Sequence, residues 1–220
     1  LVPSSSMLPT LLVSDVVFVT KYSFGWRAVP LADRFSFSDD WALAPRLPNR
    51  ADIVVVRSPA VEDGELNRLV IKRVIGLPGD DVRLIGGRLE VRTKPVDLRA
   101  LTHRDSAGFH QEKAEHVYFR ETLPEGLTND DRAPASYIIQ DRGMTRDDDF
   151  GPYSVSDGHL FLLGDNRDNS EDSRTAVLSV VPVDNLIGRA QFILLSINDR
   201  SHLTGWGFPF RLGRFLKPLQ

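Results

Sequence analysis

The central apolar segment of the chain reads Val70-Ile-Lys-Arg-Val-Ile-Gly-Leu-Pro-Gly-Asp80. A β-branched run of this kind, closed by a turn of glycine and proline, is typical of a strand in a buried sheet. Lys72 stands inside the run, and a strand lysine normally points to solvent. If Lys72 faced inward instead, burial would lower its pKa, because a low-dielectric site disfavours the ammonium. The segment therefore predicts a core strand, and the pKa of its lysine depends on whether the side chain points inward or to solvent.

The remaining apolar segments are also short, rich in β-branched residues and bounded by Gly, Pro or Asp. We expect strands at 15–20, 53–56, 82–85, 88–92, 160–163 and 191–195, with a hairpin turn at Gly86-Gly87. Short helices are favoured only at 4–12 and after Ser173. The sequence therefore predicts a mainly β protein.

The composition narrows the class of protein. The chain has 220 residues, of which 41% are hydrophobic and 26% charged, and this balance excludes a disordered or fibrous protein. Because there is no Cys, disulfides, thiolate metal sites and a cysteine nucleophile are excluded as well. The net charge of −3 argues against a nucleic-acid partner. No apolar run approaches the roughly 20 residues that a membrane-spanning helix needs.

Residues 93–157 differ in texture from the rest of the chain. They hold fewer strong strand patterns and carry two acidic clusters. We interpret them as an inserted, partly β cap subdomain, which divides the core into two segments, 1–92 and 158–200. The last segment, 201–220, interleaves four aromatic residues with Arg and Lys, a pattern that suits a membrane-proximal tail.

Two polar motifs accompany the central segment. The first is Pro3-Ser-Ser-Ser-Met-Leu-Pro-Thr-Leu11, in which three hydroxyls lie between two prolines that restrict the backbone. The second is Gly164-Asp-Asn-Arg-Asp-Asn-Ser-Glu-Asp-Ser-Arg174, a polar loop that follows an expected strand. Each motif alone is typical of ordinary loops and caps. A loop with only polar side chains and one Gly nonetheless favours a hydrogen-bonded network.

Taken in order, the three motifs resemble the type I signal peptidase (leader peptidase) family, which are bacterial membrane-bound serine proteases with a Ser–Lys dyad. The family pattern P-S-x-S-M-x-P-T-L falls on residues 3–11, K-R-V-I-G-L-P-G-D on 72–80 and G-D-N-R-x-N-S-x-D-S-R on 164–174. Weaker similarity covers 52–56 and 181–189. The resemblance touches most of the chain outside the cap, and it implies a catalytic core that is a β-barrel or a coiled β-sheet.

The resemblance implies a role for the polar residues of the motifs. Ser6 would be the nucleophile and Lys72 its general base. A lysine with its ordinary pKa of about 10.4 is protonated at neutral pH, so the base has to be a desolvated, neutral amine. Ser4 and the Ser6 N–H would stabilise the oxyanion, and Ser170 would orient the lysine. Structural support beneath the site would come from Asp165, Arg167, Asp172 and Arg174.

The family cleaves after small residues in an A-x-A pattern, so the resemblance implies shallow apolar pockets. By position, the expected pocket walls are Val2, Met7, Leu11, Val17, Val70 and Ile71. The same residues would suit a plain core equally well. The expected substrate is the signal peptide of an exported preprotein, bound in an extended form along strand edges.

The resemblance also implies a location. Family members carry a membrane anchor just before the serine motif, so we expect a transmembrane segment upstream of Leu1. The catalytic domain would then lie on the periplasmic side of the cytoplasmic membrane. Seven aromatic residues at 18–41, together with the tail, would suit contact with the lipid bilayer surface, although loop packing explains them equally well. We expect a monomer with no cofactor. We also expect no metal, since His110 and His116 match no zinc spacing.

Three positions depart from the family pattern. Ser5 stands where Gly is usual, and it would be strained if the backbone needs a positive φ there. Ala51 replaces the Gly of an R-G-D turn, and Ser179 lies where Gly is common. None of the three departures removes a reacting group.

Three other interpretations stay open. One is a specialised pilus- or conjugation-linked processing protease of the same family. A second is a self-cleaving repressor with the same dyad, but neither a helix-turn-helix nor a basic face is visible. A third is a non-catalytic β-rich binding module that keeps the fold. The presence of Ser6, Lys72 and Ser170 together argues against this third interpretation.

Overall fold

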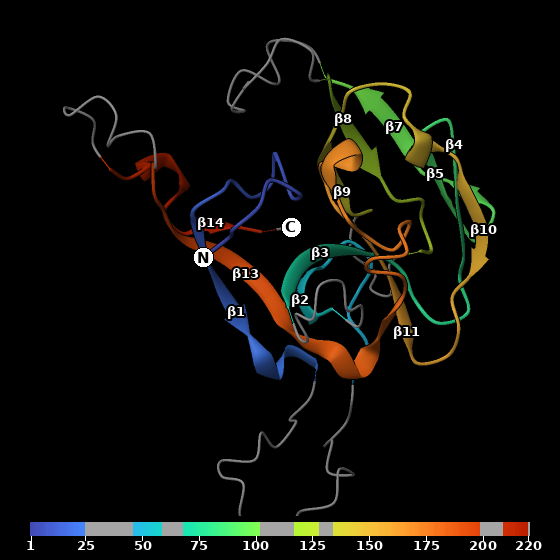
Figure 1. The fold of residues 1–220 in the computed structure, drawn as a ribbon, viewed down its shortest axis with the longest axis horizontal. Coiled ribbons are helices and arrows are strands. Elements are labelled where there is room, and N and C mark those ends of the chain that lie inside the picture. The colour runs from blue at the N-terminus through green and yellow to red at the C-terminus, as the bar shows by residue number, and fades with distance from the viewer. Residues whose placement is uncertain (25–45, 59–67, 102–116, 128–133, 199–208, 220) are drawn as a thin grey trace, which may run out of the picture.

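Antiparallel strands are the main regular structure of the described chain (Figure 1). The computed structural model describes residues 1–24, 46–58, 68–101, 117–127, 134–198 and 209–219. The strands are β1 (Asp15–Thr20), β2 (Ile53–Arg57), β3 (Leu69–Gly76), β4 (Asp81–Ile85), β5 (Arg88–Val91), β6 (Lys94–Pro95), β7 (Asp97–Ala100), β8 (Val117–Thr122), β9 (Ser136–Asp141), β10 (Phe150–Ser154), β11 (His159–Leu163), β12 (Val181–Pro182), β13 (Leu186–Ser196) and β14 (Lys217–Pro218). The helical elements are short 3₁₀ turns: η1 (Lys21–Phe24), η2 (Arg146–Asp148), η3 (Arg167–Asn169), η4 (Val183–Asn185) and η5 (Leu212–Arg214). The mainly β class and the expected strands are confirmed.

The largest sheet has seven strands. They follow the order β1-β13-β2-β3-β11-β12, with β14 added beside β13. Every neighbouring pair is antiparallel, and the register between β1 and β13 shifts at two places. Within the described ranges, no pairing joins β1 to β12. The core is therefore an open sheet, and the closed-barrel form of the prediction is wrong.

Two smaller sheets lie together beside the large one (Figure 1). One has the order β10-β4-β5-β6, and the other has the order β7-β8-β9. Strand β4 precedes residue 93 and β10 follows it, so the first of these sheets takes strands from both sides of the expected start of the cap. Strand pairing thus does not set residues 93–157 apart, and the division into core and cap stays a prediction.

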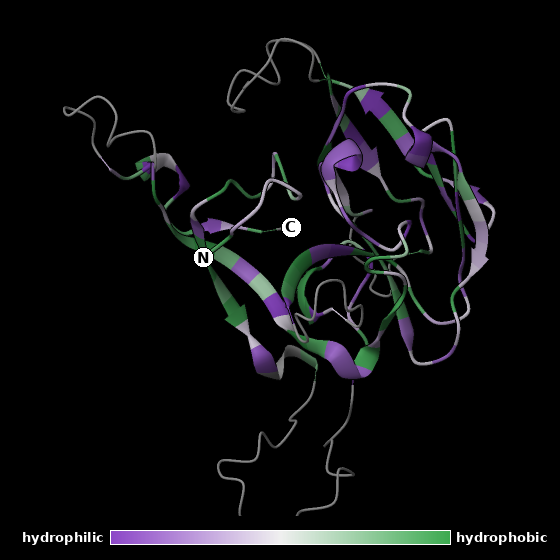
Figure 2. Cartoon of the chain, viewed as in Figure 1, coloured by the Kyte–Doolittle hydropathy of each residue, from purple (hydrophilic) through white to green (hydrophobic). Residues whose placement is uncertain are grey.

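Apolar clusters cover both faces of β3. Val74 packs with residues of β2 and β11 in one cluster, whereas Ile75 packs with β4, β5 and β9 in another. Successive strand residues face opposite sides, so these two neighbours show that β3 is buried on both faces. In Figure 2 the curved strands β2 and β3 are largely green, while the outer strand β10 is pale purple. A third cluster packs Met7 and Leu11 against β2 and β13.

Residues 4–12 form turns, not the short helix expected from sequence, and so does the stretch after Ser173. Tertiary contacts compete with a helical ladder in the first segment. The Ser6 carbonyl, for example, accepts a hydrogen bond from the backbone N–H of Asn166 at 3.1 Å. Both helix predictions are wrong because local propensity did not register partners that are distant in sequence.

Candidate active site

Strand β3 presents Lys72 and Arg73 to opposite faces of the large sheet. The strand lies between β2 and β11, and Val54 of β2 is the register partner of Lys72. Both charged side chains are buried, with 3% of Lys72 and 0% of Arg73 exposed. Of the two orientations considered from sequence, the structure contains the inward-facing lysine.

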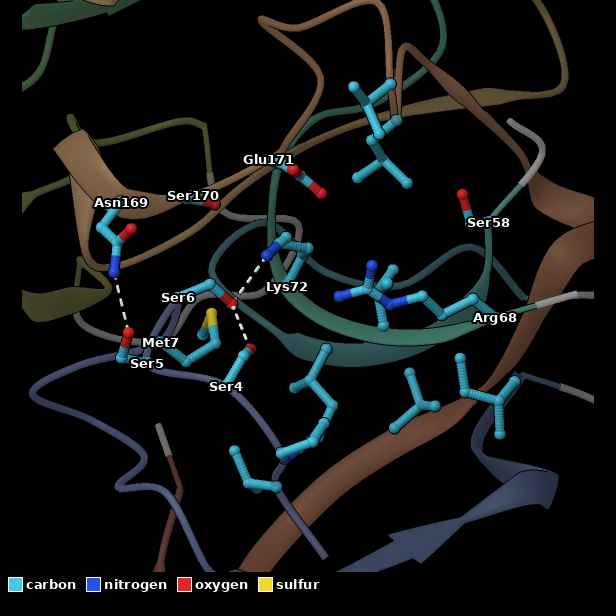
Figure 3. A pocket seen from close by; sticks show the side chains of 18 of the residues that line it. Ser4, Ser5, Ser6, Met7, Ser58, Arg68, Lys72, Asn169, Ser170 and Glu171 are labelled. Carbon is cyan, nitrogen blue, oxygen red and sulfur yellow. Dashed lines mark hydrogen bonds between the residues drawn. The ribbon is translucent and has the colours of Figure 1, made fainter. Parts of the chain in front are cut away.

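The serine motif lies against this lysine (Figure 3). Lys72 Nζ donates a hydrogen bond to Ser6 Oγ at 2.8 Å, and Ser4 Oγ lies 3.3 Å from the same oxygen. The hydroxyl of Ser5 is engaged elsewhere, because it accepts a hydrogen bond from Asn169 Nδ2 at 2.8 Å. Residues 4–6 form bends and a turn, and this local conformation brings the hydroxyls of Ser4 and Ser6 together while that of Ser5 lies apart.

Burial lowers the pKa of Lys72 from 10.5 to about 8. Removal of the ammonium from water is the largest cause, because the low-dielectric site favours the neutral amine. The nearby carboxylates of Asp172 and Glu171 oppose this shift, and the positive charge of Arg68 reinforces it. With a pKa of about 8, about a tenth of the side chains carry a neutral amine at pH 7. That amine can accept a proton.

A cavity of about 680 Å³ contains the serine motif and the lysine. This volume is within the usual range for ligand-binding clefts. The expected wall residues that line it are Val2, Met7, Val17, Val70 and Ile71. Leu11 is fully buried in the third apolar cluster instead, so its prediction as a wall residue is wrong. Its place in the motif gave no indication that the chain would turn it toward the core.

Ser170 lines the cavity, but it does not bond the lysine. Its hydroxyl is buried and has no hydrogen-bond partner within the described parts of the chain, so the expected orienting bond to Lys72 is not formed in this structure. A buried polar group without a partner costs about 1–3 kcal/mol. Gly164 permits the close packing here, because a Cβ on it would overlap Ser170 and lie 2.6 Å from the Ser6 carbonyl oxygen.

Arg73, on the other face of β3, is fully paired. Its guanidinium donates to both carboxylate oxygens of Asp165 at 2.7 Å, and it lies 4.2 Å from the centre of the Tyr137 ring. Thr10 of the serine motif donates to the same carboxylate at 2.5 Å. Asp165 therefore connects β3 to the segment that carries the nucleophile candidate.

The other residues expected to support the site are also buried in charged contacts. Arg174 donates to Asp172 at 2.9 Å, and Arg167 donates to both oxygens of Glu121 on β8, at 2.7 and 2.5 Å. Asp172 in addition accepts from the Gly164 N–H at 3.0 Å. These contacts link the polar loop to itself and to the three-stranded sheet.

Sequence reasoning missed several residues of this network, among them Arg73, Gly164 and Asn166. For Arg73 there was a signal, because strand alternation puts the neighbour of an inward lysine on the opposite buried face, where a cation needs a partner. The position of Gly164 directly after a strand was a weaker signal. Asn166 holds the Ser5 and Ser6 carbonyls from about 160 positions away along the chain, and no sequence pattern reveals such a contact.

Two of the three departures from the family pattern have left-handed backbone. The φ of Ala51 is 71° and that of Ser179 is 54°, a region that glycine occupies without the strain a Cβ introduces. Ser5 does not have a positive φ, so the strain considered for it does not arise. Its carbonyl and hydroxyl are instead hydrogen-bonded to Asn166 and Asn169.

The aromatic residues expected at a membrane surface are only partly described. Those outside the described residues are Trp26, Phe35, Phe37, Trp41, Trp206 and Phe208. Phe18 stacks on Phe192 with 4.8 Å between ring centres, and 42% of Phe18 stays exposed. In the tail, Phe215 is exposed, whereas Arg214 pairs with buried Asp15 at 2.6 Å. The described part of the tail is thus anchored by an arginine and presents apolar side chains to solvent.

No helix in the described ranges combines the length and apolar character that a bilayer crossing needs. The same ranges hold no group of three or more His, Cys, Asp or Glu residues arranged to bind a metal ion. His110 and His116 lie outside them.

The chain is similar to known proteins along most of its length. Residues 1–195 match the family described as signal peptidase, peptidase S26. The signal peptidase I of Rickettsia typhi is 37% identical and the alignment covers 99% of this chain and 84% of that protein. For the signal peptidase I of Rickettsia akari the identity is 38%, with coverage of 89% and 70%. A crystal structure of a signal peptidase I from Enterococcus faecalis V583 aligns with a TM-score of 0.37 and 21% identity, over 66% of this chain and 97% of that one.

The sequence matches include the whole cavity. The last residue of the cavity lining is Leu178, and the family match extends beyond it to residue 195. The serine motif, the lysine strand and the polar loop therefore all lie within the matched region. The chain belongs to the signal peptidase family, peptidase S26, and is a serine endopeptidase.

Proposed function

We propose that this chain is the catalytic domain of a membrane-anchored endopeptidase that removes signal peptides from exported preproteins, with Ser6 as nucleophile and Lys72 as general base. The observation that carries the proposal is the 2.8 Å contact between Lys72 Nζ and Ser6 Oγ inside the cavity. This contact joins the two atoms between which the proton has to move. Burial supports the assignment, since it brings the pKa of the lysine to about 8.

The reaction follows from this pair. Ser6 Oγ attacks the scissile carbonyl carbon while the neutral amine of Lys72 takes the hydroxyl proton. The tetrahedral intermediate then loses its amine, and the Lys72 ammonium returns the proton to the leaving nitrogen. Water attacks the resulting ester with Lys72 again as base, which releases the carboxylate product and restores the serine. An arginine could not serve in this position, because it does not give up its proton.

The developing oxyanion needs hydrogen-bond donors next to the serine. The Ser4 hydroxyl and the Ser6 N–H are the candidates, and each donor of this type is worth about 3–4 kcal/mol in the transition state. The 3.3 Å separation of the Ser4 and Ser6 oxygens supports this assignment. Ser170 stays the proposed orienting residue, since it lines the same cavity as the lysine and its hydroxyl has no other partner in the described chain.

The proposed specificity is for small residues before the scissile bond, in the A-x-A pattern. The supporting observation is that apolar side chains line the cavity: Val2, Met7, Val17, Val70 and Ile71. Walls of this kind accept a methyl group and exclude larger or charged side chains.

Membrane anchoring and a periplasmic position of the domain belong to the same proposal. The exposed apolar side chains of the tail, among them Phe215, support contact with lipid. Phe215→Ser should lower the fraction of protein bound to anionic liposomes by about half or more, because burial of an aromatic side chain favours the bilayer. Ile85→Ser, also at an exposed apolar position but on β4, is the matched control. Equal binding of both variants would contradict lipid contact through the tail.

The decisive experiment is cleavage of a fluorogenic peptide that contains an A-x-A signal sequence. The wild-type chain should cut after the second Ala, and Ser6→Ala or Lys72→Ala should abolish the cut. Ser156→Ala and Lys94→Ala, at exposed positions that do not line the cavity, should leave it intact. Full activity of Lys72→Ala would disprove the dyad.

The alternatives give different results in the same assay. A specialised pilus or conjugation protease would leave a panel of A-x-A signal sequences uncut and cleave one precursor. A non-catalytic binding module would bind the peptides without cleaving any of them.

A further inference from the structure

Asn166 holds two consecutive carbonyls of the serine motif. Its side-chain Nδ2 donates to the Ser5 carbonyl at 3.0 Å, and its backbone N–H donates to the Ser6 carbonyl at 3.1 Å. The residue is 1% exposed and lies two positions after the glycine that lets this loop approach the motif. Neither bond involves the hydroxyl or the amine of the proposed dyad, so the contact acts on the backbone of the motif alone.

Fixing the Ser5 carbonyl fixes the direction of the Ser6 N–H. The peptide bond between the two residues is trans and planar, so its C=O and N–H point in opposite directions. With the carbonyl directed at Asn166, the N–H is directed away from Asn166. In the described chain the Ser6 N–H donates to no backbone carbonyl, whereas the Ser5 carbonyl accepts a second bond from the Leu8 N–H at 3.1 Å. The Ser6 N–H is therefore held in a defined orientation and has no backbone acceptor in the described chain.

A residue from β9 sets the orientation of the Asn166 amide. Gln140 Nε2 donates to Asn166 Oδ1 at 3.4 Å, and the Gln140 N–H donates to the Asp165 carbonyl at 2.8 Å. With its oxygen directed at Gln140, the Asn166 amide turns its NH₂ group toward the Ser5 carbonyl. Gln140 is 1% exposed and lies in the segment that sequence analysis assigned to the cap.

We infer that Asn166 is a positioning residue: it holds the Ser5–Ser6 peptide so that the Ser6 N–H stabilises the oxyanion, and Gln140 holds Asn166 in turn. The inference rests on the proposed function, in which that N–H is an oxyanion donor. The inference also gives the three-stranded sheet a role in catalysis, because β9 supplies Gln140, the residue that holds Asn166.

The test is Asn166→Asp, which keeps the shape of the side chain but replaces the donor with an oxygen that repels the Ser5 carbonyl. We expect kcat to fall by about 10–100-fold with KM changed by less than about twofold, since an oxyanion donor acts in the transition state. Affinity for a peptide aldehyde, which forms a tetrahedral adduct on the serine, should fall by the same factor. Affinity for a non-cleavable peptide of the same sequence should not change. Asn185→Asp is the matched control, because its amide bonds the Arg57 carbonyl away from the cavity.

A pH profile separates positioning from general loosening of the site. Asn166 does not contact Lys72, so kcat/KM of the uncharged variant Asn166→Leu, which brings no new carboxylate near the lysine, should keep the wild-type midpoint and be lower by one constant factor at every pH. A shifted midpoint, an equal change in KM and in aldehyde affinity, or an unchanged kcat would overturn the inference. If Asn166→Asp does not fold, Gln140→Met carries the same test, with an expected loss in kcat of about 3–10-fold. If the wild-type chain itself cleaves no A-x-A peptide, it is the proposed function that fails.

Discussion

The two faces of β3 give two neighbouring buried cations different kinds of partner. Lys72 and Arg73 are adjacent, and both are buried. Arg73 donates to both oxygens of Asp165, whereas Lys72 donates to the hydroxyl of Ser6 and forms no ion pair in the described chain. The paired cation keeps its charge, and the lysine loses its proton at a pH of about 8. Burial alone therefore does not separate the two cations: arginine keeps its proton in either setting, whereas burial lowers the pKa of a lysine that has no carboxylate partner among the described residues, and only the lysine can work as a base.

Burial of Lys72 makes the free energy of unfolding depend on pH. The pKa of Lys72 is about 8 in the folded chain and 10.5 when unperturbed, so between these values the unfolded chain binds more protons. The free energy of unfolding should therefore rise as the pH rises from about 8 to 10.5, and the penalty of holding an ammonium in the site is fully present below pH 8. From the size of the shift this penalty is about 3 kcal/mol.

The largest effect on activity is expected from replacing Lys72, the cation that β3 presents to the cavity. Lys72→Met should lower kcat/KM by more than about 1,000-fold, because no base remains for the serine. At pH 7 the free energy of unfolding of this variant should exceed that of the wild type by up to about 3 kcal/mol. Between pH 8 and 10.5 the free energy of unfolding of the variant should not rise. Denaturant titrations at several pH values measure this. Lys94→Met, at an exposed position, is the control, and a pH slope equal to that of the wild type in Lys72→Met would contradict the account.

Breaking the buried ion pair of Arg73 and Asp165 should chiefly lower stability. Arg73→Met leaves the buried carboxylate of Asp165 without its cation, and the free energy of unfolding should fall by about 3–5 kcal/mol. The double variant Arg73→Met/Asp165→Leu should recover much of that loss, because no unpaired charge remains. Urea unfolding gives both values. Arg83→Met, which breaks an exposed pair with Glu90, should lose less than about 1 kcal/mol, and an equal loss in both arginine variants would refute the comparison.

The charges at the edge of the cavity should tune the lysine in opposite directions. The wild-type profile of kcat/KM should rise through a pH of about 8 as Lys72 loses its proton. Glu171→Gln removes a charge that raises the pKa, so the midpoint should move down, and Arg68→Gln should move it up. Each shift should be smaller than about one pH unit, because both side chains are exposed and screened. Midpoints that move in the same direction would contradict the assignment of these charges.

The smallest effect is expected at a position that does not line the cavity. Ser179 has a φ of 54°, and Ser179→Gly should raise the free energy of unfolding by up to about 1 kcal/mol, because glycine has no Cβ to strain. The midpoint of the pH profile should stay where it is. Ser156→Gly, at a residue without a positive φ, should instead lower stability slightly through added chain entropy. Stabilisation by both changes would mean that φ is not the cause.

Much of the local structure could be predicted because it depends on local patterns. The strand at 53–56 and the Gly86-Gly87 turn follow from β-branched runs and from glycine's access to positive φ. The closed barrel, the helix at 4–12 and Leu11 as a wall residue were wrong, since each depends on how distant segments pack. The absence of a bond to Ser170 belongs to the same group, because it depends on side-chain placement inside an assembled cavity.

Which groups are present, and in what order, follows from the amino-acid sequence alone: a serine flanked by serines, a lysine inside an apolar strand and a polar loop after another strand. Which of these groups meet depends on tertiary packing. Ser6 and Lys72 are 66 residues apart, and Arg73 and Asp165 are 92 apart, yet each pair is in hydrogen-bond contact. The pKa of a buried group depends on the solvent and charges around it, and these surroundings exist only once strands from distant parts of the chain have formed one sheet.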